Sequence, residues 1–391
     1  MKRILTVTVL SLFHFISTAQ NIVFTDSNFK NCLLANNLIN INNDNDISVL
    51  EAQSVTESLI INPYINISSL DGIENFINIK HLTCTNNNMQ IIDLSQNTKL
   101  ITINLSNNKL TYLDVSTCEN LLYLSLNHNK LPTIDLNSNT TLTYLNCNNN
   151  SLIKLNITNA PLLKYVDLSY NSIKTLNLQN NILIDTLILT SNLLPSLDLS
   201  KNINLTKVDI SSNQITSLDF NNNTILQSIF CDNNKLSTID LSSLSELSSL
   251  TVDNNNLISL DASNNLKLKY LVCSNNQIKK LNLTMNDSLR GLSCNNNQID
   301  TLDLDNHEKL ESLNCSFNKL SSLLLANTHL YRLYCQSNNL IFLDLTKLDY
   351  NPIEVHAQSN PNLTKICIGQ IAQFSQCTSM GHGVVICQTL Y

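Results

Sequence analysis

The stretch from Leu268 to Leu283, LKYLVCSNNQIKKLNL, decides the fold because close copies of it recur along most of the chain. Its first half has the form LxxLxCxxNxL, and its second half follows the form LxxLDL before a short connection. From Ile79 onward the unit returns every 21 residues. Copies start at Leu100, Leu121, Leu142, Leu163, Ile184, Leu205, Leu226, Leu247, Leu268, Leu289 and Leu310, and one residue early at Leu330. We count thirteen regular copies, with an atypical copy before them and another after.

The spacing of apolar residues within each copy indicates short β-strands. Every second residue is apolar, so these side chains point inward and the residues between them face solvent. We expect two short strands per copy, on opposite sides of a flattened coil. Neighbouring coils then stack as parallel strands, and at about 4.8 Å per coil the thirteen copies give a rod or shallow arc roughly 60 Å long. The predicted fold class is an α/β repeat, mainly β: a solenoid of parallel strands with a small helical cap at its N-terminus.

An asparagine ends the first half of every regular copy. These residues are Asn87, Asn108, Asn129, Asn150, Asn171, Asn192, Asn213, Asn234, Asn255, Asn276, Asn297, Asn318 and Asn338. The chain bends after each strand and leaves backbone groups without partners, and a buried amide can donate to one coil and accept from the next. We therefore interpret this asparagine ladder as architecture rather than as a row of ligand-binding side chains.

Two further segments carry a resemblance to a known family. The repeats resemble the short nested leucine-rich repeats of secreted and surface proteins of Bacteroidetes. The segment Ile67–Phe76, ISSLDGIENF, is similar to the lead-in that internalin-like proteins have before their first regular repeat, and Asn360–Thr364, NPNLT, is similar to their closing motif. The resemblance covers about Asn21 to Cys387. It implies a leucine-rich-repeat solenoid that acts as a non-catalytic interaction module, and no sharper function.

The first nineteen residues have the layout of a secretory signal peptide. Lys2 and Arg3 precede a mainly apolar run, and small residues lead to a predicted cleavage site after Ala19. We expect a signal peptide over 1–19, an N-terminal cap over 20–57, the solenoid over 58–351, and a last atypical repeat with a cysteine-containing C-terminal cap over 352–391. The protein is accordingly predicted to be secreted, extracellular or at the cell surface.

Net charge and hydropathy exclude some classes of partner. Without Lys2 and Arg3 the chain has 21 basic and 30 acidic residues, a net charge of −9. An acidic protein is a poor match for nucleic acid or an anionic membrane surface. The apolar run near the N-terminus is too short to span a membrane, and no later stretch is long enough. We expect neither nucleic-acid binding nor membrane insertion.

Most of the cysteines share one inward position of the repeat. They are Cys84, Cys147, Cys231, Cys273, Cys294, Cys315 and Cys335, and other copies have Leu105, Leu126 or Leu168 there. A residue that alternates with leucine acts as a small hydrophobe. We name this set the cysteine column. Cys367, Cys377 and Cys387 lie outside it, and two of them could close a disulfide in the C-terminal cap in an oxidising compartment; the sequence does not say which two.

The N-terminal cap contains a candidate calcium site. A short helix is predicted over Asp26 to Asn36, with Phe29, Leu33 and Leu34 on its apolar face. The loop after it has oxygen-bearing side chains and a final glutamate at the spacing of an EF-hand: Asn40, Asn42, Asp44, Asp46, Ser48 and Glu51. Asparagine occupies the first loop position, and Asn45 stands where glycine makes the sharp turn. Ca²⁺ stabilising the cap and a simple polar linker are equally consistent with this loop.

A row of tyrosines is the candidate ligand site. Tyr123, Tyr144 and Tyr165 occupy the third, outward position of successive copies. Nearby outward positions hold Asp167, Asp209 and Phe230. Stacked exposed aromatics are typical of binding surfaces for proteins or glycans. The alternative is that the rings only stabilise neighbouring strands.

Aspartates form a further column in the second half of the repeat. They are Asp93, Asp114, Asp135, Asp198, Asp219, Asp240, Asp261, Asp303 and Asp344, and we name them the acidic column. Carboxylates on adjacent coils repel one another, so each requires a backbone donor, a lysine or a cation. We favour hydrogen bonding within the repeat over a cation-binding stripe.

No catalytic motif stands out from the repeat. The chain has no nucleophile elbow, phosphate-binding glycine loop or zinc signature. We therefore predict that the protein is not an enzyme and binds a protein or glycan ligand on the sheet that carries the tyrosines. The alternative is a structural or adhesive cell-surface protein with a calcium-stabilised cap. The partner and the oligomeric state are not determined by the sequence.

Overall fold

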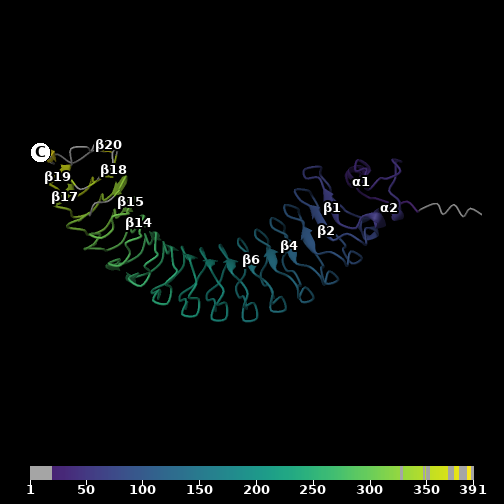
Figure 1. Ribbon diagram of the computed structural model, residues 1–391, viewed down its shortest axis with the longest axis horizontal. Helices are drawn as coiled ribbons and strands as arrows, with labels where there is room; N and C mark the ends of the chain where they lie inside the picture. Colours follow the sequence, from purple (N-terminus) through teal and green to yellow (C-terminus); the bar gives the residue numbers. More distant parts are fainter. Residues whose placement is uncertain are drawn as a thin grey trace, which may run out of the picture.

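The protein is a curved solenoid (Figure 1). The computed structural model describes residues 20–325, 329–346, 348 and 353–368, together with the strand backbone of 374–377 and 385–388. The predicted signal peptide over 1–19 lies outside the described residues. A parallel sheet of 16 strands lines the inner, concave side of the arc, and the connections lie on its outer side (Figure 1). The predicted fold class is confirmed.

Each regular copy contributes one strand to the 16-stranded sheet. The strands are β1 Ser58–Ile61, β2 His81–Cys84, β3 Thr102–Asn104, β4 Tyr123–Ser125, β5 Tyr144–Asn146, β6 Tyr165–Asp167, β7 Thr186–Ile188, β8 Lys207–Asp209, β9 Ser228–Phe230, β10 Ser249–Thr251, β12 Tyr270–Val272, β14 Gly291–Ser293, β15 Ser312–Asn314, β16 Arg332–Tyr334, β18 Ile353–His356 and β20 Phe374–Cys377. The thirteen regular copies supply β2 to β16 of this sheet, β1 precedes them, and β18 and β20 continue it. The core lies behind the sheet, where residues such as Leu247, Leu250 and Val252 are fully buried.

The outer side of the arc contains fewer strands than the sequence suggests. In the described residues, the second half of the repeat forms paired strands in β11 Ser259–Asp261 with β13 Lys280–Asn282, and in β17 Phe342–Leu345, β19 Lys365–Ile368 and β21 Val385–Gln388. An isolated parallel bridge joins Asp135 to Asn156. The prediction of a second strand in every coil is therefore wrong. Curvature explains the difference, because coils that are spaced for pairing on the inside of an arc are farther apart on its outside.

The asparagine ladder is architectural, as predicted. In Asn213, Nδ2 donates to the carbonyls of Leu189 and Ile210 at 3.0 and 3.1 Å, and Oδ1 accepts from the N–H of Leu194 at 3.0 Å. Both inter-coil bonds reach the preceding coil, which corrects the expectation of one bond to each neighbour. The residue before each ladder asparagine has φ between 52° and 57°, so the amide bridges a tight turn in the left-handed region.

The acidic column also serves the repeat. In every member, one carboxylate oxygen accepts the backbone N–H two residues later, at 2.8–3.1 Å. The N–H of Ser116 in this way lowers the pKa of Asp114, and that of Ser242 lowers the pKa of Asp240. The favoured interpretation, hydrogen bonding within the repeat, is confirmed.

The cysteine column lies inside the core. All seven thiols are free and buried, and burial raises the pKa of Cys84 and Cys147 to about 12. These residues pack as small hydrophobes, as predicted. Of the three C-terminal cysteines, Cys367 is a free thiol in register with Cys387. Cys377 is in register with Val355 in the other sheet, and the side chains of Cys377 and Cys387 lie outside the described residues.

A helical cap closes the N-terminal end of the solenoid (Figure 1). Helix α1 spans Ser27–Leu34 and buries Phe29 and Leu33, which confirms the predicted helix. One oxygen of its N-cap, Asp26, accepts from the N–H groups of residues 28 and 29. The other accepts from the N–H and hydroxyl of Ser68, at 2.7 and 2.8 Å. Asp26 thereby connects the cap to the first coil.

The lead-in segment turns at a glycine that the packing requires. Gly72 has φ +106°, and a Cβ there would lie 2.7 Å from Cε1 of Phe24. The turn leads into the 3₁₀ helix η1, Ile73–Asn75, and a second helix, α2, spans Val49–Ser54.

Candidate functional site

The predicted tyrosine row is a continuous ring stack on the concave sheet. Tyr123, Tyr144 and Tyr165 are register partners on β4, β5 and β6. The ring centroids of the first pair are 4.2 Å apart with the planes inclined by 10°, and those of the second pair are 4.6 Å apart with the planes inclined by 5°. The rings are half-buried. Burial, and then the neighbouring Tyr144, raise the pKa of Tyr123. The three residues form a rigid platform that presents phenol groups to solvent; we call it the tyrosine stack.

Asp167 lies at the edge of the stack and is held by its own neighbours. Its side chain is buried. One carboxylate oxygen accepts from the N–H and hydroxyl of Ser169, at 3.0 and 2.6 Å, and the other accepts from Nδ2 of Asn148 at 2.8 Å. Both carboxylate oxygens therefore have partners within the sheet. Asp167 orders the sheet surface beside the tyrosine stack rather than facing a ligand.

The other two predicted residues lie farther along the sheet. Asp209 is two strands beyond Tyr165, and Phe230 is three strands beyond it. They share this place with Lys207, whose Nζ lies 5.6 Å from the centroid of the Phe230 ring. The structure thus separates the six predicted residues into the tyrosine stack with Asp167 and a smaller cluster around Phe230. Lys207 was not singled out from the sequence, because its pairing with Phe230 crosses between two strands.

In the candidate calcium loop, Glu51 is engaged by the chain itself. Its Oε2 accepts from the N–H and hydroxyl of Ser48, at 2.9 and 2.8 Å, in a capping box at the start of α2. Its Oε1 accepts from the N–H groups of Ile41 and Asn42, at 3.1 and 3.4 Å. Burial acts to raise the pKa of Glu51, and the hydrogen bonds, led by the N–H of Ser48, outweigh it and lower the pKa.

Most of the other side-chain oxygens of the loop also have partners in the chain. Asn42 and Asp44 each accept the backbone N–H two residues later, at 3.0 and 2.8 Å, and Asp46 pairs with Lys30. Oδ1 of Asn40 is buried without a hydrogen-bond partner. Among the described residues, no group of three or more His, Cys, Asp or Glu side chains is placed to hold a metal ion. Apart from Oδ1 of Asn40, these side-chain oxygens are engaged by the chain itself, and Ca²⁺ binding stays a prediction.

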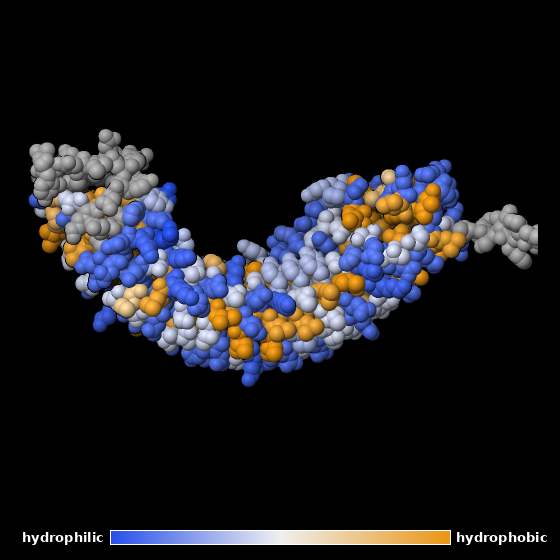
Figure 2. Space-filling model, in the orientation of Figure 1, coloured by the Kyte–Doolittle hydropathy of each residue, from blue (hydrophilic) through white to orange (hydrophobic). Residues whose placement is uncertain are grey.

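The surface around these sites is mixed. The flank shown in Figure 2 is largely hydrophilic, with separate apolar patches. In the described part of the chain, no helix has the length and apolar character needed to cross a membrane.

Comparison with solved structures gives the family. The functional domain of InlJ from Listeria monocytogenes, described as including a cysteine ladder, is 30% identical to this chain, with a TM-score of 0.71. The match covers 90% of this chain and 84% of the InlJ domain. The chain belongs to the internalin-type leucine-rich-repeat proteins.

Other solved structures share this fold. The internalin InlF from Listeria monocytogenes is 26% identical with a TM-score of 0.70, over 76% of this chain and 91% of InlF. The leucine-rich effector YopM from Yersinia pestis shares the fold at 24% identity and a TM-score of 0.63, over 85% of this chain and 88% of YopM. No protein-family model matches the chain, and no curated protein matches it significantly.

This internalin-type chain has its own cysteine column in the core. Four of its members, Cys273, Cys294, Cys315 and Cys335, occupy consecutive coils and are fully buried. The column therefore contributes to packing behind the sheet.

Proposed function

We propose that this internalin-type protein is a non-enzymatic binding protein that holds a protein or glycan ligand on its concave sheet. The observation that carries the proposal is the tyrosine stack. Its three parallel rings form one continuous surface over three coils. The repeat also supports a binding role over catalysis, because the asparagine ladder and the acidic column are already engaged in hydrogen bonds to the backbone.

A tyrosine platform suits recognition for two physical reasons. Each ring has few rotatable bonds, so holding it against a ligand costs little conformational entropy. Each ring also joins an apolar face to a hydroxyl, which allows apolar contact and hydrogen bonding at one place. The same outward position holds Thr186, Ser228 and Ser249 farther along the sheet, so the stack stands out from a polar background. Aromatic anchors of this kind carry much of the binding energy in protein interfaces.

We further propose that the protein acts outside the cytoplasm, either secreted or displayed at the cell surface. The basic start, apolar run and small residues before Gln20 support this proposal. N-terminal sequencing of the protein exported from its native host tests it: a mature chain beginning at Gln20 is expected. A cell-associated protein that retains its first nineteen residues contradicts it.

Ca²⁺ binding to the Asn40–Glu51 loop is a separate proposal that concerns stability of the cap. Calorimetric titration of the full chain and of Glu51→Gln with CaCl₂ tests it. Saturable heat in the unmodified chain that the variant loses supports a calcium site. Equal heats in both proteins reject it and leave the loop as a polar linker closed by the capping box.

The binding proposal is tested with residues 20–391 on arrays of extracellular proteins and glycans. The variant Tyr123→Ala/Tyr144→Ala/Tyr165→Ala removes the stack. The matched control Tyr64→Ala/Tyr112→Ala/Tyr170→Ala removes three exposed tyrosines that lie outside it. We expect the stack variant to weaken the binding of a captured ligand by about 2 kcal/mol or more, a roughly 30-fold loss of affinity. The control variant should bind the ligand normally.

Circular dichroism establishes that both variants remain folded. A ligand that binds both variants equally places recognition away from the stack. Absence of any ligand in either array favours the alternative, a structural or adhesive role in which repeat number matters more than one surface.

A further inference from the structure

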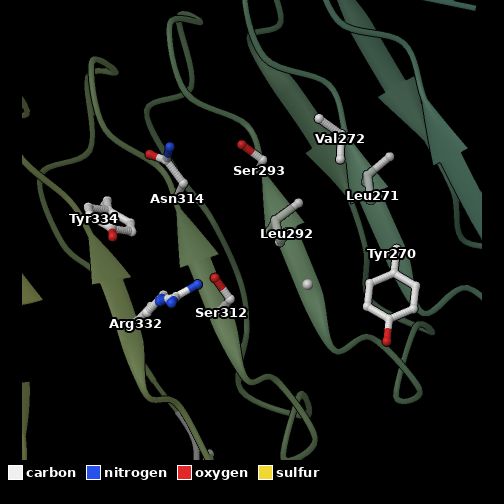
Figure 3. Close-up of a pocket in the computed structure, with 10 residues that line it drawn as sticks. Tyr270, Leu271, Val272, Leu292, Ser293, Ser312, Asn314, Arg332 and Tyr334 are labelled. Carbon is white, nitrogen blue, oxygen red and sulfur yellow. The ribbon is translucent and has the colours of Figure 1, made fainter. Parts of the chain in front are cut away.

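A hollow interrupts the concave sheet near its C-terminal end (Figure 3). It has a volume of about 290 Å³. Tyr270 stands on one side, and Arg332 with Tyr334 stands on the other, while Ser293 and Asn314 lie along a third side (Figure 3). These residues come from β12, β14, β15 and β16, four consecutive strands of the sheet.

The hollow exists because two successive coils lack a bulky residue at the third position. Gly291 follows Tyr270 in register, and Ser312 follows Gly291. A Cβ at Gly291 would lie 3.2 Å from Cδ1 of Tyr270, so the tyrosine ring leans over the glycine backbone. In the tyrosine stack the same position holds three rings in succession. Here a single ring faces open space across the floor formed by Gly291 and Ser312.

The far wall of the hollow is held in place by one carboxylate. Oε1 of Glu354 accepts from the hydroxyl of Tyr334 and contacts Nε2 of His356, both at 3.0 Å. The rings of Tyr334 and His356 stack, with centroids 4.8 Å apart. Hydrogen bonds from His356 and Tyr334 lower the pKa of Glu354, which keeps the carboxylate ionised beside Arg332.

Arg332 keeps donor capacity for a ligand. Its Nε forms an ion pair with Oε2 of Glu354 at 3.6 Å, longer than a hydrogen bond, and 54% of its side chain is exposed. The guanidinium reaches toward Ser312 at the edge of the hollow (Figure 3). A guanidinium offers five N–H donors in a planar fork that matches a carboxylate.

Three basic residues and two glutamates lie around the hollow. The sequence has three arginines: Arg3, Arg290 and Arg332. Arg290 directly precedes Gly291 and pairs with Glu311 at 2.6 Å, and the exposed Lys269 precedes Tyr270. Glu311 and Glu354 offset Arg290 and Arg332, which leaves the positive charge of Lys269 at the rim of the hollow, in a chain whose net charge is −7.

We propose that this hollow receives the carboxylate side chain of an Asp or Glu residue of a protein ligand. The guanidinium of Arg332 donates to the carboxylate, the side chains of Ser312 and Asn314 offer further polar contacts, and the ring of Tyr270 covers the aliphatic stem. The inference rests on the proposed function, because it assigns a second contact point on the same sheet. Tyr270 lies five strands beyond Tyr165, which is about 24 Å at the spacing of parallel strands, so one protein ligand can reach both.

The chain provides a specific reporter for this test. It contains five glycines, Gly72, Gly291, Gly369, Gly381 and Gly383, so the full chain labelled with ¹⁵N-glycine gives a simple amide spectrum. The Gly291 signal is identified by its loss in Gly291→Ala. The probes are the capped peptide acetyl-Gly-Asp-Gly-amide, its Asn counterpart and sodium glucuronate, each titrated at low ionic strength.

We expect the Asp peptide to shift the Gly291 signal saturably in the millimolar range, and the Asn peptide to leave it unchanged. Arg332→Gln should raise the dissociation constant at least about 10-fold, because the charge-assisted bonds are lost. Lys207→Gln makes the same charge change at the same repeat position, six strands earlier, and should bind normally.

Three outcomes overturn the proposal. One is no shift with the Asp peptide at any concentration, and another is equal shifts with the Asp and Asn peptides. The third is a shift with glucuronate alone, which assigns the hollow to acidic sugars. The variant that lacks the tyrosine stack should titrate like the unmodified chain, so failure of the stack proposal and failure of this one are distinguishable.

Discussion

Removing one ladder asparagine should destabilise the solenoid far more than removing an exposed asparagine from the same coil. Asn213→Ala deletes the amide that accepts from the N–H of Leu194 and donates to the carbonyl of Leu189, both in the preceding coil. The carbonyl of Leu189 keeps a second donor, Nδ2 of Asn192 at 3.1 Å, so the substitution orphans only the N–H of Leu194. Asn213 and Leu194 are buried, so this N–H is shielded from water. An unsatisfied buried group costs about 1–3 kcal/mol, which sets the expected loss.

Urea unfolding of the full chain followed by far-ultraviolet circular dichroism measures this loss. Asn222→Ala is the matched control, because Asn222 is exposed in the same copy, and it should change the free energy of unfolding by less than about 0.5 kcal/mol. Asn213→Asp adds a second comparison. It retains an acceptor but places carboxylate oxygen against the carbonyls of Leu189 and Ile210, so at pH 7 it should destabilise at least as much as alanine.

Equal stability of Asn213→Ala and Asn222→Ala would refute the reasoning. It would mean that water or a shift of the turn satisfies the orphaned N–H of Leu194 at little cost. Amide hydrogen exchange separates these cases, since the bonded N–H of Leu194 should exchange faster in Asn213→Ala than in the unmodified chain.

Three further predictions concern acid stability and the thiols. Backbone N–H groups lower the folded-state pKa of acidic-column residues such as Asp240 below the ordinary 3.8. The stabilisation that these carboxylates provide is therefore complete above about pH 3.8 and is lost as the pH falls through the lowered pKa. The melting temperature should decline on acidification below about pH 4, and Asp240→Asn should reduce that decline. The cysteine column should resist iodoacetamide in the native protein and react after unfolding, because burial keeps the thiols protonated. Mass spectrometry of the labelled peptides measures this, and rapid labelling of the native protein would contradict the prediction. In oxidised protein, non-reducing peptide mapping should join Cys367 to Cys387, which are register partners, and leave Cys377 unpaired; a bond to Cys377 would show that the register of the last coils is different.

Repetition makes much of this protein readable from sequence. Each coil stacks on a near copy of itself, so residues 21 positions apart become spatial neighbours. For this reason the spacing of Tyr123, Tyr144 and Tyr165 was enough to predict a ring stack. The buried cysteine column, the asparagine ladder and the hydrogen-bonded acidic column follow from the same rule, because a fixed position in the repeat has one environment in every coil.

The tertiary structure decided what depends on curvature and on differences between neighbouring coils. Most second halves of the repeat in the described residues form no paired strand, because neighbouring coils are farther apart on the outer side of the arc. This curvature is a property of the whole stack of coils, not of a single repeat. The sequence placed Asp167 among outward residues, yet its side chain is buried and accepts hydrogen bonds from Ser169 and Asn148. Asn148 belongs to the preceding coil, so this arrangement depends on which residues two neighbouring coils bring together. The hollow over Gly291 likewise requires the ring of Tyr270 on one coil and Arg332 on another. A repeat consensus determines the positions that coils share, whereas the functional surface depends on where particular coils depart from it.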